Sequence, residues 1–284
     1  KVQDGCDYGC SYCTIPAARG SSRSPSIKSI KEKTLILAEK GVKEVVLTGV
    51  NTGDFGKRTG ETLTDLLGEL VKVEGIERFR ISSIEPNLLT DDLIEMMTES
   101  PKILPHFHIP LQSGSNKILG LMRRRYKREL FSDKVRKIKD RSPLAGIGAD
   151  IITGFPGETE EDFNDTYKFI DDLPLSYLHV FPYSERPGTA AVNLPGKVTY
   201  HDKELRSKKL HALADLKHRE FMRVNAGEEA DVLFEHVKTN GMISGFTGNY
   251  IRVEYPWKTD LAGKITRIRM KGVSGSGRMS AEII

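Results

Sequence analysis

All three cysteines of this chain, Cys6, Cys10 and Cys13, lie within one short stretch and are spaced C-x3-C-x2-C. Thiolates gathered in this way are typical ligands of a soft metal centre. A structural zinc site takes four protein ligands, and no fourth lies nearby in the sequence. A disulfide framework needs an even number of cysteines. An iron–sulfur cluster is normally held by four thiolates, so three would leave one iron open. The spacing therefore favours such a cluster over three-thiol zinc or three unrelated buried cysteines.

An aromatic residue, Tyr12, directly precedes the last cysteine. The spacing C-x3-C-x2-C with an aromatic residue at this position resembles the signature of the radical S-adenosylmethionine (SAM) enzymes. That resemblance implies that Cys6, Cys10 and Cys13 hold a [4Fe–4S] cluster. It also implies that the open iron binds the amino and carboxylate groups of SAM.

Composition limits the class of protein. The 284 residues suffice for one barrel-like domain and a small module, and contents of 38% hydrophobic and 29% charged residues are typical of soluble globular proteins. No run of about 18 apolar residues occurs, so we expect no membrane span. The net charge of +4 is too small to indicate nucleic-acid binding by itself. Reduced cysteines point to the cytoplasm. Because residues 1–3 are typical of a strand interior, we expect a fragment of a longer protein.

Apolar, β-branched segments alternate with amphipathic ones through the first two thirds of the chain. Strands are expected in a first segment ending at residues 3–4, and at 44–48, 79–84, 107–109, 146–152 and 177–181. Helices are expected at 26–40, 63–71, 90–97, 116–122, 129–139 and 159–171. Alternating βα units predict a parallel sheet with right-handed crossovers. Because six units are fewer than the eight of a closed barrel, we expect an α/β fold, an open (β/α)6 partial TIM barrel.

The pattern changes after Pro195. A charged helical connector is expected at 200–224, followed by short strands at 230–237, 249–254, 264–271 and 279–284. Turns are expected between them at 240–241, 247–248 and 272–277. This pattern predicts a small antiparallel β-barrel. The predicted domains are therefore a core at 1–198, a connector at 199–224 and a barrel at 225–284.

Polar residues and glycines follow the predicted strands, where active sites of such folds are built. Thr48 and Gly49 follow the second strand, and a glycine there lets backbone carbonyls approach a ligand closely. Ser83 and Glu85 follow the third strand. The Glu85 carboxylate is suited to a ribose hydroxyl or an ammonium group, or it caps the turn before Pro86.

Later strands add further candidates. Gln112 follows the fourth strand, Asp150 lies on the fifth and needs a partner, and Phe181 ends the sixth, where it can stack on adenine or a substrate base. His106 and His108 are conceivable metal ligands, but we expect strand histidines with satisfied hydrogen bonds. The basic run 122–128 is typical of a solvated helix face. Two functional interpretations are that it supplies a guanidinium for the SAM carboxylate, or that it contacts RNA phosphates.

Together these elements resemble the methylthiotransferase branch of the radical SAM enzymes over almost the whole chain. The matching stretches are 1–6, 47–49, 82–86, 108–113, 154–159 and 181–190, followed by a TRAM-like barrel. The resemblance implies SAM contacts at Tyr12, Thr48, Gly49, Ser83, Glu85, Gln112, Arg125, Asp150 and Phe181. Arg125 is chosen here from the basic run as the match to an M-x-R-x-Y-like element. The amino-acid sequence of residues 2–8 is most similar to that of enzymes that act on threonylcarbamoyladenosine in tRNA.

The resemblance implies a transferase that adds a methylthio group to C2 of N6-threonylcarbamoyladenosine 37 in tRNA by way of a 5′-deoxyadenosyl radical. It implies a tRNA anticodon loop, an electron donor such as flavodoxin or ferredoxin, and a sulfur source as partners. Complete members carry an amino-terminal domain with a second [4Fe–4S] cluster, for which this chain has no cysteines. That domain either precedes Lys1 or is lacking, in which case the protein cannot insert sulfur by itself.

A basic face is predicted on the carboxy-terminal barrel. No acidic residue occurs between the first and the last of its cations in the sequence. Its members are Lys264, Arg267, Arg269, Lys271 and Arg278. We expect them to contact the RNA backbone, although alternating polar residues on a solvated strand give the same pattern. Two alternatives stay open for the whole chain. One is methylthiolation of isopentenyladenosine in tRNA or of a ribosomal-protein aspartate, and the other is a metal-bound RNA-binding module without catalysis.

Overall fold

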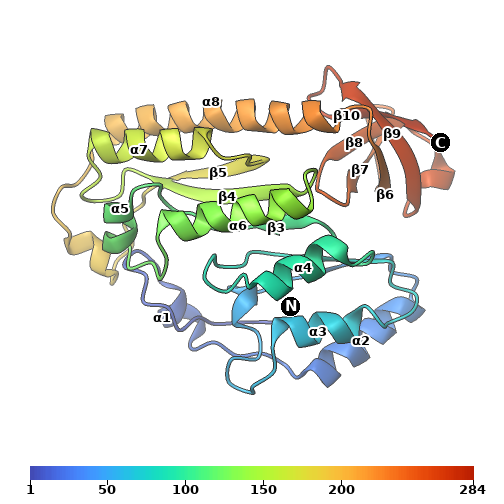
Figure 1. The fold of residues 1–284 in the computed structure, drawn as a ribbon, viewed down its shortest axis with the longest axis horizontal. Coiled ribbons are helices and arrows are strands. Elements are labelled where there is room, and N and C mark those ends of the chain that lie inside the picture. Colours follow the sequence, from blue (N-terminus) through green and yellow to red (C-terminus); the bar gives the residue numbers. More distant parts are fainter.

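The computed structural model describes residues 1–284 and contains an α/β core followed by a β-barrel (Figure 1). The core strands are β1 (Glu44–Leu47), β2 (Arg78–Ile81), β3 (His106–His108), β4 (Gly146–Thr153) and β5 (Tyr177–Pro182). The core helices are α1 (Ile15–Arg19), α2 (Ile27–Glu39), α3 (Leu63–Leu70), α4 (Asp91–Glu99), α5 (Asn116–Leu121), α6 (Arg128–Arg141) and α7 (Glu160–Asp171). No helix combines the length and the apolar composition that crossing a bilayer requires.

The core strands are all parallel, as the alternation of strands and helices predicts. β1 pairs with β2, and β3, β4 and β5 form a second set. A bridge between Phe79 and Ile103 and a hydrogen bond from the Ile84 N–H to the His108 carbonyl (3.0 Å) connect the two sets. The first predicted strand is reduced to a bond from the Val2 N–H to the Thr48 carbonyl (2.8 Å). The result is an open partial barrel, which confirms the predicted fold class.

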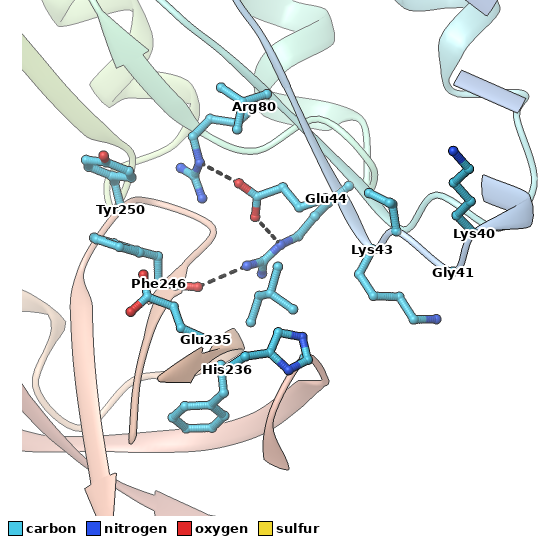
Figure 2. A pocket seen from close by; sticks show the side chains of 15 residues that line it. Lys40, Gly41, Lys43, Glu44, Arg80, Glu235, His236, Phe246 and Tyr250 are labelled. Carbon is cyan, nitrogen blue, oxygen red and sulfur yellow. Dashed lines mark hydrogen bonds and ion pairs between the residues drawn. The ribbon is translucent and has the colours of Figure 1, made fainter. Parts of the chain in front are cut away.

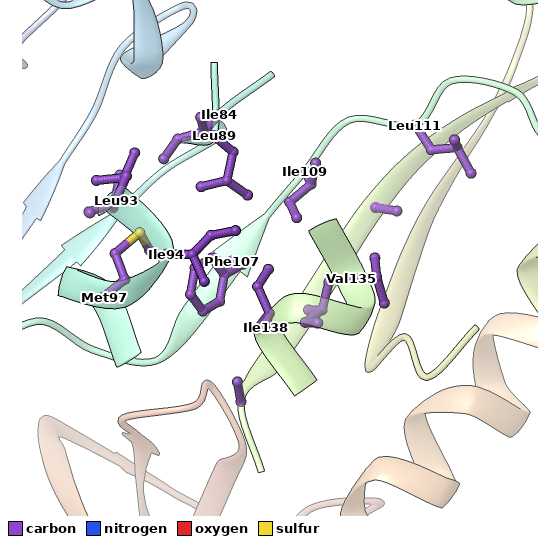
Figure 3. Packing of buried hydrophobic residues seen from close by; sticks show 14 of the residues in the cluster. Ile84, Leu89, Leu93, Ile94, Met97, Phe107, Ile109, Leu111, Val135 and Ile138 are labelled. Atoms are coloured by element: carbon purple, nitrogen blue, oxygen red, sulfur yellow. The ribbon is translucent and has the colours of Figure 1, made fainter. Parts of the chain in front are cut away.

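Local signals in the sequence explain where the helices begin. Ser26, Thr90 and Ser115 each accept a hydrogen bond from a backbone N–H in the first turn of α2, α4 and α5. Thr159 and Asp162 form a complete capping box at the start of α7. The apolar faces of α2, α3, α4, α6 and α7 pack on one face of the sheet in a single cluster of 36 buried residues, part of which Figure 3 shows between α4, β3 and α6. Ile118 of α5 belongs to a separate, smaller cluster. The helices therefore cover the outer face of the sheet and leave its inner face for other contacts.

The helix α8 (Tyr200–Asn225) joins the core to the barrel. In Figure 1 it runs beside α7 and β5 and ends at the barrel. Leu210 and Leu213 belong to the core cluster, whereas Phe221 and Met222 belong to the separate cluster inside the barrel. One continuous helix thus packs into both hydrophobic cores, which fixes the distance between them.

The barrel is closed and has five strands, one more than the strand pattern predicts. They are β6 (Glu229–Thr239), β7 (Met242–Thr247), β8 (Arg252–Pro256), β9 (Ile265–Val273) and β10 (Met279–Ile283), in the order β10-β8-β7-β6-β9. The pairs are antiparallel except for a short parallel pairing of β10 with β8. The missed strand is β7. The turn before it is formed by Asn240 and Gly241, both with positive φ, as a tight hairpin requires.

The barrel packs against the amino-terminal ends of the core strands through two buried arginines (Figure 2). Arg78 and Arg80 both donate to Glu44, with Nε–O distances of 2.7 and 3.0 Å. Their remaining N–H groups donate to barrel carbonyls of Asp231, Phe246, Thr247 and Gly248 at 2.9–3.2 Å. Burial lowers the pKa of Arg78, and Glu44 opposes that effect. The ion pairs and carbonyl contacts therefore hold the barrel at the end of the sheet opposite to the cysteines.

Replacing Glu44 would leave two buried guanidinium groups without a counter-charge. We expect Glu44→Gln to lower the free energy of unfolding by about 3 kcal/mol, the usual cost of removing one partner of a buried ion pair. Urea denaturation followed by the fluorescence of Trp257, the single tryptophan, reports on the barrel against which it packs. Glu77→Gln is the matched control, because its ion pair with Lys43 is exposed, and should cost less than about 0.5 kcal/mol. Equal effects of the two substitutions would contradict this account.

Candidate functional site

The cysteine loop lies at the carboxyl end of the sheet. Its three thiols are free and half-buried. The backbone N–H of Tyr8 donates to Cys6 Sγ, and that of Ile15 donates to Cys13 Sγ, each at 3.4 Å. The loop begins at Gly5, whose φ is +69° and where a Cβ would come within 2.1 Å of the Ser21 carbonyl oxygen. Only glycine fits this turn, which brings the first cysteine toward the others.

The donor set of the loop fits an iron–sulfur cluster. The three sulfurs come from one loop, and no further cysteine occurs in the chain to supply a fourth thiolate. At Gly9, on the exposed side of the loop, no atom lies within 4 Å of an added Cβ. Three soft donors that receive N–H bonds, with open space beside them, suit a cluster with one iron free of protein.

A buried arginine, Arg124, lies directly against this loop. Its Nη1 donates to Cys10 Sγ at 3.2 Å, and its Nη2 forms an ion pair with Glu85. Its Nε donates to the Tyr126 hydroxyl at 3.2 Å, and its Nη1 reaches the Tyr12 hydroxyl at 3.4 Å. Only 4% of the Arg124 side chain is exposed. Burial raises the pKa of Glu85, and the Arg124 guanidinium opposes that rise. The loop and the end of β2 thus meet at one charged group.

The basic-run residue chosen from the sequence, Arg125, occupies a different place. It is exposed, lies 4.0 Å from the centre of the Tyr8 ring and donates to the Asp7 carbonyl at 3.3 Å. The preceding Arg123 has a φ of +58°, which ends α5 with a sharp turn and directs Arg124 inward. The sequence contained a signal that favours Arg124 over Arg125, because Met122-x-Arg124-x-Tyr126 matches M-x-R-x-Y. In the structure, Met122 and Tyr126 are both buried.

A second hydrogen-bonded group crosses the inner face of the sheet from the end of β2 to β5. Ser83 Oγ lies 2.5 Å from His108 Nδ1, and His108 Nε2 lies 3.1 Å from Asp150 Oδ1. His179 Nδ1 lies 3.2 Å from the same Asp150 oxygen. Burial alone would raise the pKa of Asp150, but hydrogen bonds from both histidines outweigh it and lower the pKa to about 2. The bond to Asp150 raises the pKa of His179. Asp150 and His108 therefore have the partners that the sequence predicted, whereas His179 was not a candidate.

The remaining residues predicted to bind the cofactor make no side-chain hydrogen bonds to Arg124 or to the group formed by Ser83, His108 and Asp150. Gln112 adopts a φ of +69° and exchanges backbone hydrogen bonds with Asp150 and Ile152 at 2.7 and 2.9 Å. Phe181 is 52% exposed, with its ring centre 6.4 Å from that of His179. Thr48 is exposed, and Gly49 is half-buried beside Gln3. Their roles toward a cofactor stay predictions.

Gln3 and two residues after β1, Asn51 and Asp54, were not chosen from the sequence as part of the site. The Gln3 side-chain oxygen accepts the N–H groups of Val50 and Asn51 at 2.9 Å each and so holds the loop after β1. Asn51 is buried with both side-chain polar atoms unpaired, and one carboxylate oxygen of buried Asp54 is unpaired as well. Burial raises the pKa of Asp54. Unsatisfied buried polar atoms in this loop are what a polar ligand would satisfy.

The predicted basic face of the barrel is largely paired with acids. Arg269 and Arg267 lie 2.8 and 3.4 Å from Glu229 on the neighbouring β6. Lys271 pairs with Glu282 on β10, and Arg278 lies 3.8 Å from Glu254 on β8. Lys264 is exposed and has no ion pair. The acids come from adjacent strands, which the spacing along β9 does not reveal. Contact of this face with RNA remains a prediction.

Comparison with known proteins identifies similar sequences and folds. Residues 1–170 match the Radical SAM superfamily. The chain is 41% identical over 276 residues to the threonylcarbamoyladenosine tRNA methylthiotransferase of Bacillus subtilis, covering 95% of this chain and 61% of that protein. The enzyme of that name from Aquifex aeolicus is 42% identical, with 94% and 64% covered. The tRNA-2-methylthio-N(6)-dimethylallyladenosine synthase of Aliarcobacter butzleri is 37% identical, with 96% and 64% covered. The chain thus spans less than two thirds of these relatives.

Two solved structures share the fold at low sequence identity. The radical SAM methyltransferase TsrM of Kitasatospora setae matches with a TM-score of 0.56 and 16% identity, over 86% of this chain and 41% of that one. Coproporphyrinogen III oxidase of Escherichia coli matches with a TM-score of 0.55 and 16% identity, over 77% and 52%. At this identity the likeness concerns the fold alone, and it agrees with the open partial barrel.

The pair formed by Asp150 and His179 predicts a pH dependence of stability. The pKa of His179 in the folded protein lies above its ordinary value of 6.5. The stabilisation of the folded state by its pair with Asp150 is therefore complete below pH 6.5 and is lost as the pH rises through the pKa of the folded protein. Since the folded pKa of Asp150 is about 2, stabilisation is also lost as the pH falls from 3.8 toward 2. Asp150→Asn should therefore cost more stability at pH 5.5 than at pH 8.5. The difference should stay below about 1 kcal/mol because solvent screens His179.

Urea denaturation of both proteins at the two pH values measures this difference. Asp133→Asn serves as the control, because Asp133 has no ion pair and lies on the outer helix α6. A cost for Asp150→Asn that is equal at both pH values would contradict the pairing.

Proposed function

The chain belongs to the radical SAM superfamily, and from that premise we propose that it is the catalytic core of a tRNA methylthiotransferase. The proposed substrate atom is C2 of N6-threonylcarbamoyladenosine 37, and the proposed product carries a methylthio group there. The observation that carries this proposal is the 41–42% identity, over nearly the whole chain, to two enzymes named for that reaction. The identity includes the barrel as well as the core, because the matches cover 94–95% of the chain.

The proposed roles of the site residues follow from their positions. Cys6, Cys10 and Cys13 would hold the [4Fe–4S] cluster, and Arg124 would bind the SAM carboxylate with an N–H group beside Cys10. Glu85 keeps this guanidinium charged and oriented. The cluster and SAM, when bound, supply the one-electron cleavage that yields a hydrogen-abstracting radical. The protein orients the substrate beside them and excludes water.

The remaining partners are part of the same proposal. No cysteine besides the cluster ligands occurs in these 284 residues, so a second [4Fe–4S] cluster would take its ligands from other protein sequence. An electron donor such as flavodoxin or ferredoxin and a sulfur source would be required for turnover in the cytoplasm. The tRNA anticodon loop would contact the core, and the barrel at 225–284 would contact the RNA backbone. Lys264, the unpaired cation of the predicted basic face, is the strongest candidate on the barrel for a contact with the RNA backbone.

A second substrate is supported by one specific observation. A relative that is 37% identical is named as a dimethylallyladenosine synthase. The two substrates share the adenine whose C2 would react and differ only in the group on N6. We favour threonylcarbamoyladenosine because the relatives named for it are more similar in sequence.

Nucleoside analysis tests the proposed function. The full-length protein that contains this chain is expressed in a bacterial strain lacking its own threonylcarbamoyladenosine methylthiotransferase, and digested tRNA is examined by mass spectrometry. We expect the methylthio derivative of threonylcarbamoyladenosine to appear with the wild type and to be absent with Cys10→Ala. Appearance of only the dimethylallyl product, or of neither product, would contradict the proposal.

The placement of Arg124 predicts a specific loss of SAM affinity. Arg124→Met removes a charge-assisted hydrogen bond, which should weaken SAM binding to the iron-reconstituted protein about ten- to hundredfold. Equilibrium dialysis with labelled SAM measures the dissociation constant. Arg125→Met is the matched control and should change it less than about threefold, because Arg125 lies on the surface. Iron content is measured in parallel, and a larger loss with Arg125→Met would overturn the assignment.

A further inference from the structure

Three strands present polar and aromatic side chains on the inner face of the sheet. On β5, Leu178 and Val180 are buried in the core cluster, so the alternate residues Tyr177, His179 and Phe181 face the other way. The His179 side chain is 53% exposed. Asp150 on β4 lies beside it and is paired with it in the sheet register. These side chains form an accessible wall. It includes Asp150 and Phe181, whose contact with SAM rests on the resemblance alone, but none of Cys6, Cys10, Cys13 and Arg124.

Two polar atoms of this wall have no partner in the protein. His108 Nε2 and His179 Nδ1 both bind the same oxygen, Asp150 Oδ1. This leaves Asp150 Oδ2 and His179 Nε2 without a hydrogen bond. Because the pKa of Asp150 is about 2, its free oxygen is a charged acceptor near neutral pH. The bond to Asp150 raises the pKa of His179, and in the protonated imidazolium Nε2 is a donor. A donor and an acceptor therefore lie side by side on the open face.

A chain of contacts leads from this pair toward the cysteine loop. Ser83, at the start of the hydrogen-bonded group, is two residues from Glu85, which is bound to Arg124 at Cys10. The charge of Asp150 also contributes to the raised pKa of Glu85. The wall therefore continues toward the residues that contact the cysteine loop.

The other end of the wall is closed by the carboxy-terminal barrel. The Tyr250 ring stacks at 4.4 Å on His106 and at 4.7 Å on Phe246, and His106 Nε2 lies 2.8 Å from the Tyr177 hydroxyl. Arg80 lies over the same Tyr250 ring at 4.9 Å. Tyr250, Phe246 and Arg80 line a cleft of about 710 Å³ between the sheet and the barrel. Figure 2 shows these three side chains near one another. The donor–acceptor pair thus lies between the cysteine loop and this aromatic floor.

The N6 substituent of the substrate base is the group that this pair fits. This step rests on the proposed function, in which C2 of the adenine faces the cofactor and N6 therefore points elsewhere. A threonylcarbamoyl group offers a carboxylate, a hydroxyl and a urea, so it can accept from one neighbour and donate to another. A dimethylallyl group offers only hydrocarbon. We propose that His179 and Asp150 are specificity-determining residues that bind the polar N6 substituent of threonylcarbamoyladenosine.

Desolvation explains how this pair would select between the two substrates. A dimethylallyl group pressed against His179 Nε2 and Asp150 Oδ2 would remove water from both and replace none of its hydrogen bonds. Sites built to bind a polar substituent reject analogues that lack it for this reason. The pair therefore favours one substrate by contact and disfavours the other by leaving charged atoms unsatisfied.

The test uses His179→Phe in the full-length holoenzyme, because phenylalanine keeps the ring and removes both nitrogens. Two tRNAs are compared, one with threonylcarbamoyladenosine and one with dimethylallyladenosine at position 37. We expect KM for the first to rise about ten- to hundredfold and the preference between the two to shrink by a similar factor. His179→Gln, which retains a donor, should restore part of the preference.

His211→Phe is the matched control, since His211 lies exposed on α8 away from the wall, and it should leave both KM values unchanged. Unchanged KM and preference in His179→Phe would overturn the specificity assignment alone, provided that the wild type converts the threonylcarbamoyl substrate. If the wild type cleaves SAM but converts neither tRNA, the proposed function fails and the assignment with it. A stoichiometric metal ion, additional to the cluster iron and lost in His179→Phe, would also overturn it, because His108, Asp150 and His179 would then be metal ligands.

Discussion

The site depends most on the buried charge of Arg124. A guanidinium removed from water is tolerated only where partners surround it, and Glu85, Tyr126 and Cys10 supply those partners from three separate parts of the chain. Its position therefore requires the cysteine loop, the end of β2 and the connection between α5 and α6 to meet at one point. This convergence turns the polar residues at separate strand ends into one site.

The short segment from Ser83 to Glu85 links this charge to the rest of the inner face. Glu85 points to Arg124, and Ser83 begins the group that continues through His108 to Asp150. The barrel limits the space from the opposite end, where Arg78 and Arg80 bind its backbone carbonyls. The carboxy-terminal barrel, which was expected only to contact RNA, thus also borders the space beside the sheet. The core and the barrel together border the space in which we propose that the substrate binds.

The sequence predicted those features that are written in local patterns. Strand-like apolar segments alternate with helix-like amphipathic ones, and helix caps such as Thr159 mark where helices begin. These patterns predicted the parallel core and the positions of most of its helices and strands. Features that depend on neighbours across the sheet were missed. The acids that pair with the barrel arginines come from other strands, and His179 became a candidate only when β5 lay beside Asp150. The strand β7 was missed although it lies between the turns expected at 240–241 and 247–248. It contains Gly245, where a Cβ would meet the Leu233 carbonyl oxygen at 2.3 Å.

The central claim is that three thiols and no fourth protein ligand hold a cluster next to Arg124. Electron paramagnetic resonance of the reduced, iron-reconstituted protein, recorded with and without SAM, tests it most directly. The account predicts a single [4Fe–4S] signal that changes when SAM is added, because SAM binds the iron that lacks a cysteine. Zinc retained in place of iron, or a cluster signal that SAM leaves unchanged, would contradict it.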